Sequence, residues 1–467
     1  MRKLLSAVVV FLWALPSYAA ASPDVAASPL DMAGAAAIAL EKNYDLAALR
    51  EELAGSRSAA ELSGSLSNPV LELEGATGAL SKSPDEKSIG IALSQEIPLL
   101  PVGKRRQELA RAEVAVMEAR LRDQERVLAE QARRAWLDAA LAARRVELIR
   151  GQQAVAAELL GVATARFQAG DLAEFEVQQA EIDLRRNDLR QFEALAAADG
   201  ARRRLALLLG LNGAAELPPL AGIAAPSAEL PVEAELLTAA LERRPDLAAQ
   251  RREGEREAAL LSLARAEAVP PLTLALSYRN ERSSENTYDL NGGLLVPGTE
   301  QTSDRIMGMK LSLPLPLFSR NQAESVKAGA RVSAARHRLE GGRRSVAAEV
   351  RDLLAQYRLV LTALELHRTA LGPVARENFK IQQEAFALGE IGLQQLLDEK
   401  RRLGEQQEAE LTALQAAIET HSRLESSAGL VLKDKAELSS LPDFMPVRVQ
   451  TKLMPCGCNS AVSGGGQ

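Results

Sequence analysis

The sequence has few of the residue types on which most enzymes and disulfide-rich folds depend. Only two of its 467 residues are cysteines, Cys456 and Cys458, and both stand near the C-terminal end, so the body has no disulfide framework. Its three histidines, His337, His367 and His421, lack the spacing of metal ligands. No motif for a nucleophilic serine, a bound nucleotide or a catalytic zinc is found. We therefore expect neither an enzyme nor a cofactor.

Aromatic residues and excess basic charge are also scarce. The chain holds 8 Phe, 5 Tyr and 2 Trp, and its 56 Lys and Arg against 62 Asp and Glu give a formal charge of −6. Nucleic-acid binding needs a basic surface and stacking platforms, so this class is excluded. A content of 47% hydrophobic residues argues against disorder. Abundant Ala, Leu, Glu and Arg favour helix.

Long apolar runs are missing after the first residues of the chain. Residues 1–21 resemble a signal peptide, with Arg2 and Lys3 before an apolar run over 4–15 and small residues at 17–21. This run is too short to span a membrane, and no later run reaches 18 residues. We expect export, and no cysteine near the cleavage site is available for a lipid anchor.

A tail over 431–467 carries the motif Cys456-Gly457-Cys458. Two thiols at this spacing can chelate a soft metal such as Cu(I) or Zn(II). The alternative, which we favour, is a disordered tail with an oxidisable dithiol.

The pattern of apolar residues in the body of the chain predicts long helices. Between Ala110 and Ile149, positions three or four residues apart are apolar with the single exception of Glu125. A mean spacing of about 3.5 residues predicts left-handed supercoiling against partner helices. A helix over 103–169 would be roughly 100 Å long at 1.5 Å per residue, which is far beyond a compact domain.

The chain then repeats itself. The turn at Phe167–Leu172 recurs at Phe386–Ile391, with Gly170 and Gly389 as helix-ending glycines. Two earlier segments, 43–46 and 68–70, recur in the same order at 244–247 and 270–272. Three ordered matches indicate a duplication. We expect repeat 1 over 22–216, a linker over 217–231, and repeat 2 over 232–430. Their elements would be hairpins at about 70–97 and 271–313, long helices at 103–169 and 322–388, and return helices at 172–209 and 391–430. Pro373 is expected to kink or break the second long helix.

Each repeat also contains two segments in which apolar and polar or small residues alternate. They lie at 70–76, 88–97, 272–279 and 307–313. This period predicts strands with one apolar face, as in a soluble sheet or in a membrane barrel. The polar connections 79–87 and 281–302 are expected to be external loops. Four strands have open edges, which hydrocarbon does not tolerate, so lipid-facing strands would need two or three copies to close a barrel.

This arrangement resembles the TolC-type outer-membrane efflux protein family over about residues 30–430. Asn68-Pro69, residues 93–97 leading to Gly103-Lys104-Arg105, and residues 314–318 resemble its heavy-metal (CzcC-like) branch. The resemblance implies a mainly α TolC-like fold of two repeats, with long helices in an α-barrel. It also implies a trimer with a 12-stranded barrel in Gram-negative outer-membrane lipid and a periplasmic extension. Its partners would be a periplasmic adaptor (membrane fusion) protein and an inner-membrane RND pump.

The resemblance also assigns roles to the residues around the two turns. The turns would be the tips where the adaptor docks, and they comprise Arg166, Phe167, Gly170, Phe386 and Gly389. The second repeat has Ala385 in place of Arg166. The family's periplasmic gate uses acidic residues six and nine positions beyond each tip glycine. These positions hold Glu176, Gln179, Gln395 and Asp398, of which only Glu176 and Asp398 are acidic.

The resemblance implies the outer-membrane exit duct of a tripartite efflux system, which would conduct heavy-metal cations passively, with a ring of carboxylates lowering their barrier. Several alternatives stay open. The two acids could be solvated carboxylates on a helix face, the duct could serve drugs or protein secretion, and the chain could be a soluble periplasmic coiled-coil scaffold.

Overall fold

The computed structural model describes residues 29–78, 86–224, 226, 232–291 and 294–429. The predicted signal peptide at 1–21, the tail with Cys456 and Cys458, and most of the connection 79–87 lie outside these ranges.

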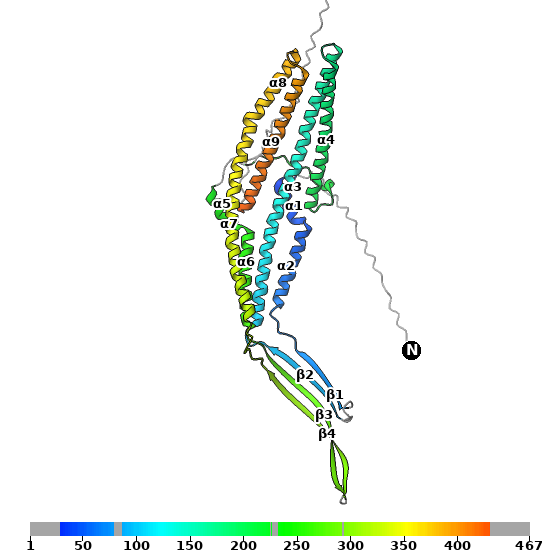
Figure 1. Ribbon diagram of the computed structural model, residues 1–467, viewed down its shortest axis with the longest axis vertical. Helices are drawn as coiled ribbons and strands as arrows, with labels where there is room; N and C mark the ends of the chain where they lie inside the picture. The colour runs from blue at the N-terminus through cyan, green and yellow to red at the C-terminus, as the bar shows by residue number, and fades with distance from the viewer. Residues whose placement is uncertain (1–28, 79–85, 225, 227–231, 292–293, 430–467) are drawn as a thin grey trace, which may run out of the picture.

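The same order of helices and strands occurs twice along the chain, in a first and a second pass, and the molecule is elongated (Figure 1). The first pass comprises α1 (Met32–Lys42), α2 (Tyr44–Leu62), β1 (Val70–Thr77), β2 (Lys87–Ile97), α3 (Val102–Gln168) and α4 (Glu174–Leu208). The second comprises α5 (Glu233–Arg243), α6 (Pro245–Ala266), β3 (Leu272–Asn291), β4 (Leu294–Ser312), α7 (Gln322–Leu366), α8 (Gly372–Leu388) and α9 (Leu393–Ala428). A 3-10 turn, Ala214–Glu216, follows α4.

The long helix is continuous in the first repeat and interrupted in the second. Helix α3 runs unbroken for 67 residues. Its counterpart is divided into α7 and α8 by a π-helical turn, His367–Leu371, just before Pro373. Proline has no N–H to donate to the preceding turn, which accounts for the irregularity at this point. Within the described ranges, no helix has an apolar stretch long enough to cross a membrane.

The strands form one antiparallel sheet in the order β1-β2-β3-β4. The two hairpins join through β2 and β3, in a register that pairs Ile97 with Leu272. Strands β3 and β4 continue as a two-stranded ribbon that pairs Asn291 with Leu294. The expectation of a loop over 281–302 is therefore wrong: cross-strand hydrogen bonds continue through its polar residues, where alternation of hydrophobicity gives no signal.

One face of the four-stranded part is apolar and the other is polar. Leu71, Leu93, Leu276 and Met309 form one row across the four strands, and a parallel row joins Leu73, Ile91, Tyr278 and Met307. All eight side chains are exposed, because none of the described elements covers this face. On the other face Arg279 pairs with Glu74 at 3.0 Å and with Glu281 at 3.3 Å. The alternation gives the sheet one apolar face and one polar face.

The described helices pack around three larger apolar clusters and a smaller one between α3 and α4. At the waist Trp136 is buried with Leu205 and Leu414, and its Nε1 donates a hydrogen bond of 2.7 Å to the carbonyl oxygen of Leu30. A second cluster surrounds Tyr357 under α5 and α6, and a third lies near the tips around Phe379 and Phe386. Fully buried alanines on α3, Ala132, Ala139 and Ala163, let neighbouring helix axes approach closely.

Candidate functional site

The two helix tips are built alike and lie at the same end of the molecule, opposite the sheet (Figure 1). Gly170 and Gly389 take left-handed backbone angles, with φ of 84° and 79°. In the first tip the N–H of Asp171 donates to the carbonyl of Arg166 at 2.9 Å, and in the second Glu390 donates to Ala385 at 2.9 Å. These six-to-one hydrogen bonds end each helix and reverse the chain, and the left-handed angle explains the glycines.

The two tips differ in their aromatic side chains. Phe386 is only 3% exposed and packs into the tip cluster, whereas Phe167 is 42% exposed. The resemblance implies that both phenylalanines belong to docking tips, although Ala385 in place of Arg166 already argues against equal contacts at the two tips. The structure gives them different surroundings, because Phe386 is covered from the first repeat.

Arg166 provides that cover. Its guanidinium carbon lies 4.4 Å from the centre of the Phe386 ring, and its Nη2 donates a hydrogen bond of 2.9 Å to the carbonyl oxygen of Ala387. The second repeat cannot return this contact, because Ala385 stands at the equivalent position. Arg166 therefore joins the two tips within one chain. Its part in adaptor docking stays a prediction.

Of the four predicted gate positions, Glu176 lies beside the residue that precedes α9 in the other repeat. Its Oε2 accepts a hydrogen bond of 3.3 Å from the backbone N–H of Ala173 at the start of α4. Its Oε1 would lie 3.9 Å from a Cβ placed on Gly392, which precedes α9. The carboxylate is thus held at the boundary between the two repeats.

Asp398 lies one and a half turns into α9 and is 40% exposed. It accepts a hydrogen bond of 3.5 Å from Gln394, and Arg401 lies 3.4 Å away. Gln395 donates to Gln382 of α8 at 3.2 Å. Gln179 presents a buried Oε1 that has no hydrogen-bond partner in the described part of the chain. The structure therefore brings the four positions to one end, each with local contacts.

A buried ion pair near the tips was not foreseen from the sequence. Lys400 of α9 is 8% exposed, and its Nζ pairs with Asp183 of α4. The Asn187 amide donates to the carbonyl oxygen of Asp183 at 2.7 Å. Burial lowers the pKa of Lys400 and Arg190 lowers it further, against the opposing effect of Asp183. A sequence signal did exist, since Lys400 stands seven residues after the buried Leu393, at a position where a helix seam is apolar.

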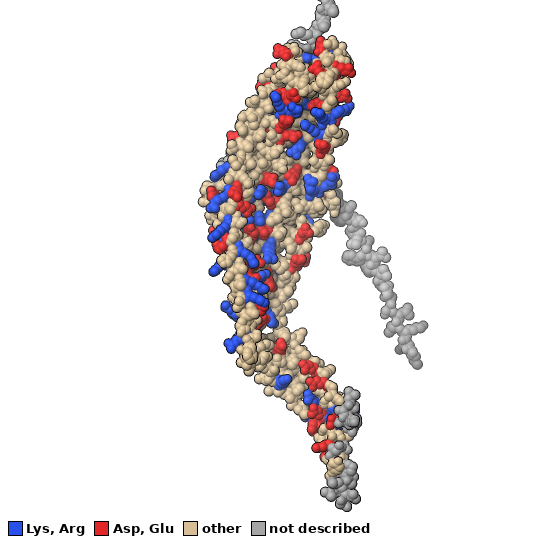
Figure 2. Space-filling view, viewed as in Figure 1, with Lys and Arg blue, Asp and Glu red and all other residues tan. Residues whose placement is uncertain are grey.

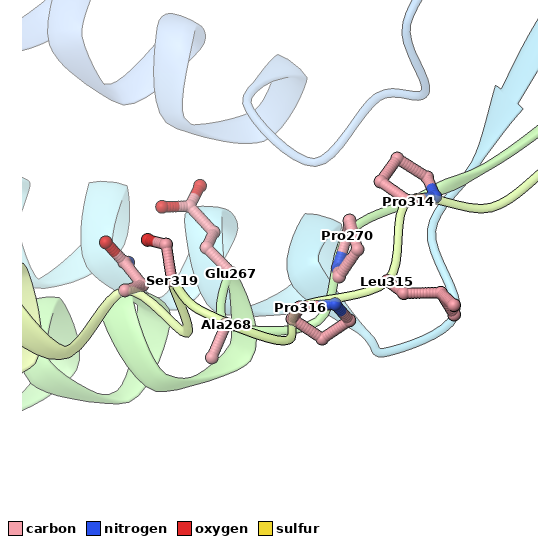
Figure 3. A pocket seen from close by; sticks show the side chains of 8 residues that line it. Glu267, Ala268, Pro270, Pro314, Leu315, Pro316 and Ser319 are labelled. Carbon is pink, nitrogen blue, oxygen red and sulfur yellow. The ribbon is translucent and has the colours of Figure 1, made fainter.

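A hollow lies at the opposite end of the helical body, where the sheet joins it (Figure 3). It has a volume of about 410 Å³ and is bordered by Glu267 and by three prolines, Pro270, Pro314 and Pro316. Figure 2 shows few charges in this part of the molecule. Nearby Phe318 is 94% exposed. Prolines fix backbone angles, so they set the direction in which the sheet leaves the helices.

Among the described residues, no group of three or more His, Cys, Asp or Glu side chains could hold a metal ion. The predicted Cys456 and Cys458 pair lies outside these residues.

Comparison with known proteins shows which proteins this chain resembles. The chain is 26% identical over 389 residues to the cobalt-zinc-cadmium resistance protein CzcC of Cupriavidus metallidurans, covering 82% of this chain and 85% of the relative. Its fold matches that of CusC with a TM-score of 0.69 at 18% identity, covering 86% and 93% of the two chains. It also matches the outer membrane channel CmeC of Campylobacter jejuni with a TM-score of 0.65 at 16% identity, covering 85% of each chain.

These likenesses confirm the TolC-like fold expected from the sequence. The family model described as outer membrane efflux protein matches residues 36–211 and 236–430, which is most of the chain and falls once in each repeat. The chain therefore belongs to the outer membrane efflux protein family.

Proposed function

We propose that this protein is the outer-membrane exit duct of a tripartite efflux system and that it conducts heavy-metal cations passively. The observation that carries the proposal is the sheet. Its rows of exposed apolar side chains, from Leu71 to Met309 and from Leu73 to Met307, stand at one end of a long helical body. Exposed rows of this kind are stable against lipid tails.

The open edges of the sheet call for further copies of the chain. Among the described residues, strands β1 and β4 each pair with a single neighbouring strand, and open edges are not stable in hydrocarbon. Three copies would close a barrel of twelve strands, with the long helices continuing as a periplasmic tunnel. The polar face with Glu74, Arg279 and Glu281 would line the interior.

The tips at the other end would meet a periplasmic adaptor and an inner-membrane pump, which supplies the energy. Glu176 and Asp398 would form the acidic constriction, three copies of each. Carboxylates in a narrow passage raise the local concentration of cations without covalent chemistry. Support for metal cations comes from the relative whose name records resistance to cobalt, zinc and cadmium.

Growth of a deletion strain tests the substrate class. We expect lower tolerance of cobalt, zinc, cadmium, copper or silver salts, with unchanged tolerance of dyes and detergents. Plasmid-borne wild-type protein should restore growth on the metal. Sensitivity confined to organic compounds would contradict the metal assignment and favour a drug duct. Extraction separates the soluble scaffold alternative, because a duct requires detergent whereas a scaffold is released in buffer.

A further inference from the structure

The apolar face of β4 continues past the end of the strand. On β4, Met307, Met309 and Leu311 alternate with polar or small residues and belong to the exposed apolar face. The same alternation goes on through the proline segment, which comprises residues 313–318 and reads Leu-Pro-Leu-Pro-Leu-Phe. Its three leucines and its phenylalanine are all exposed. Every second position from 307 to 317 is therefore apolar, although the pairing with β3 ends at residue 312.

Charged and aromatic residues mark both ends of this apolar series. Arg305 precedes it at the next position on the same face of β4, and Arg320 follows it. Tyr278 pairs opposite Met307 at the first end, and Phe318 lies at the second. Membrane barrels carry an apolar band between two girdles of aromatic residues, whose rings meet the lipid headgroups. The series has the order of residue types that such a band requires.

The paired part of the series is too short to form the whole band. Strands rise by about 3.3 Å per residue, and barrel strands tilt by about 40°. From Met307 to Leu311 the strand then covers about 10 Å along the membrane normal, whereas an apolar band is about 25 Å tall. Continuation to Leu315 extends the cover to about 20 Å, and Leu317 and Phe318 lie beyond. The proline segment therefore has to supply the rest of the band.

The prolines suit this segment to an apolar environment. A chain that leaves a sheet loses the partners of its backbone N–H groups, and unpaired N–H groups are costly in hydrocarbon. Pro314 and Pro316 have no N–H, and each keeps the preceding leucine extended. The N–H of Leu317 donates to the carbonyl oxygen of Leu315 at 2.8 Å. Figure 3 shows Leu315 pointing away from the helical body. The segment thus stays extended without a neighbouring strand.

A polar side chain on the same face has its hydrogen bonds satisfied within the chain. Gln95 stands in one row with Leu274 and Leu311. Its Nε2 donates to the carbonyl oxygens of Ser67 and Glu96, both at 2.9 Å. The amide nitrogen therefore needs no water, and this row remains compatible with lipid.

Two basic residues stand where the helical body begins, next to the proline segment. Arg320 is exposed, and its Nε donates to the carbonyl oxygen of Pro316 at 3.1 Å. Lys104 is exposed in the first turn of α3. Within the described ranges neither forms an ion pair with a carboxylate, whereas Arg106 pairs with Glu267 at 3.1 Å. Cations at the edge of an apolar band match the phosphate groups of lipid heads.

We propose that the proline segment lies in the periplasmic-side interface of the outer membrane, with Phe318 among the headgroups and with Lys104 and Arg320 in contact with phospholipid phosphates. The inference rests on the duct proposed above, whose barrel would place the apolar face in lipid. A phospholipid layer is the partner that fits, because the surface is apolar towards the sheet and basic towards the helices.

Spin labelling tests this position. In a background in which Cys456→Ser and Cys458→Ser remove the native thiols, Phe318→Cys carries a nitroxide in protein reconstituted in phospholipid vesicles. Met309→Cys reports on the sheet, and Val326→Cys, at an exposed position of α7, is the control in water. Oxygen concentrates in lipid, whereas a nickel chelate stays in water. We expect the ratio of oxygen to nickel collisions at 318 to be at least about threefold higher than at 326 and lower than at 309, deep in the apolar band.

The outcomes distinguish this inference from the duct. A high ratio at 309 with a ratio at 318 no higher than at 326 would place the proline segment in water and overturn the inference, with the duct intact. A label at 318 that neither reagent reaches would place that side chain against another copy of the chain and would also overturn it. Low ratios at both 309 and 318 would overturn the duct as well.

Neutral variants test the headgroup contacts. Lys104→Gln with Arg320→Gln should retain at least about threefold less phosphatidylglycerol than the wild type, as measured by native mass spectrometry of protein released from mixed micelles. The matched control, Lys327→Gln with Arg343→Gln, removes one lysine and one arginine that each pair with a glutamate of their own helix. Equal retention in the two double variants would show that the contacts are not specific and would overturn this part of the inference.

Discussion

Arg166 and Phe386 join the two helix tips of the chain, with the guanidinium carbon 4.4 Å from the centre of the ring. The same guanidinium donates to the carbonyl oxygen of Ala387 at 2.9 Å. The duplicated turns are therefore linked by a contact that only the first repeat can make. If the proposed duct opens by separation of its tips, this contact has to break.

Replacing Arg166 should loosen the tips. Arg166→Ala removes a cation–π contact and a hydrogen bond, which together contribute about 1–2 kcal/mol. We expect a larger open fraction in single-channel recordings of the purified protein in a planar bilayer. Arg203→Ala is a matched control, because Arg203 pairs with Asp199 of its own helix. An open fraction equal to that of the control would show that the contact does not hold the tips.

Neutralising the two acidic gate positions should weaken the attraction of cations. Glu176→Gln combined with Asp398→Asn keeps the shape of both side chains and removes six charges from a trimer. Multivalent cations should then block single-channel current several-fold less effectively. Glu405→Gln, on the exposed surface of α9, serves as the control. Unchanged block in the double variant would assign the two acids to an ordinary solvated helix face.

The buried pair of Lys400 and Asp183 should be sensitive to loss of one partner. Lys400→Met leaves the Asp183 carboxylate without its cation at a partly covered site, and should lower the stability of the tips by about 1–3 kcal/mol. Lys400→Met with Asp183→Leu should recover most of that loss, because apolar packing replaces the pair. Thermal melting followed by circular dichroism in detergent measures both. A double variant that melts no higher than the single one would contradict this account.

The lowered pKa of Lys400 has a consequence at alkaline pH. Because burial lowers the pKa of Lys400 in the folded chain below its ordinary value of 10.5, the unfolded chain binds more protons between the two values. The free energy of unfolding contributed by this group therefore rises with pH across that window and is lost as the pH falls through the folded value. We expect Lys400→Met to remove this contribution from the pH dependence of the melting temperature. An identical pH profile in the variant and in the wild type would contradict the assignment.

The sequence predicts the repeating features of the fold well, because they depend on local chemistry. Gly170 and Gly389 end their helices, and the expected kink near Pro373 coincides with a π-turn. The ribbon over 281–302 was missed, since its polar residues carry no alternation and its order depends on pairing between strands. The TolC-like fold followed from the order of the elements and not from any single motif.

The candidate site was predictable only in outline. The positions of Glu176 and Asp398 relative to the tip glycines follow from resemblance, and their roles stay predictions. Lys400 and Asp183 form an ion pair although they are 217 positions apart in the sequence. Arg166 and Phe386 are in contact although they belong to different repeats. Such contacts depend on how the long helices pack, which a periodic pattern does not specify.

The proposed duct assembles in a membrane from copies of this chain. Ionic current across a planar lipid bilayer measures whether it does. Purified, detergent-extracted protein added to one side should produce stepwise increases of current, each from the insertion of one trimer. A preparation that remains soluble in buffer and gives no current, while its circular dichroism shows folded helices, would contradict the account.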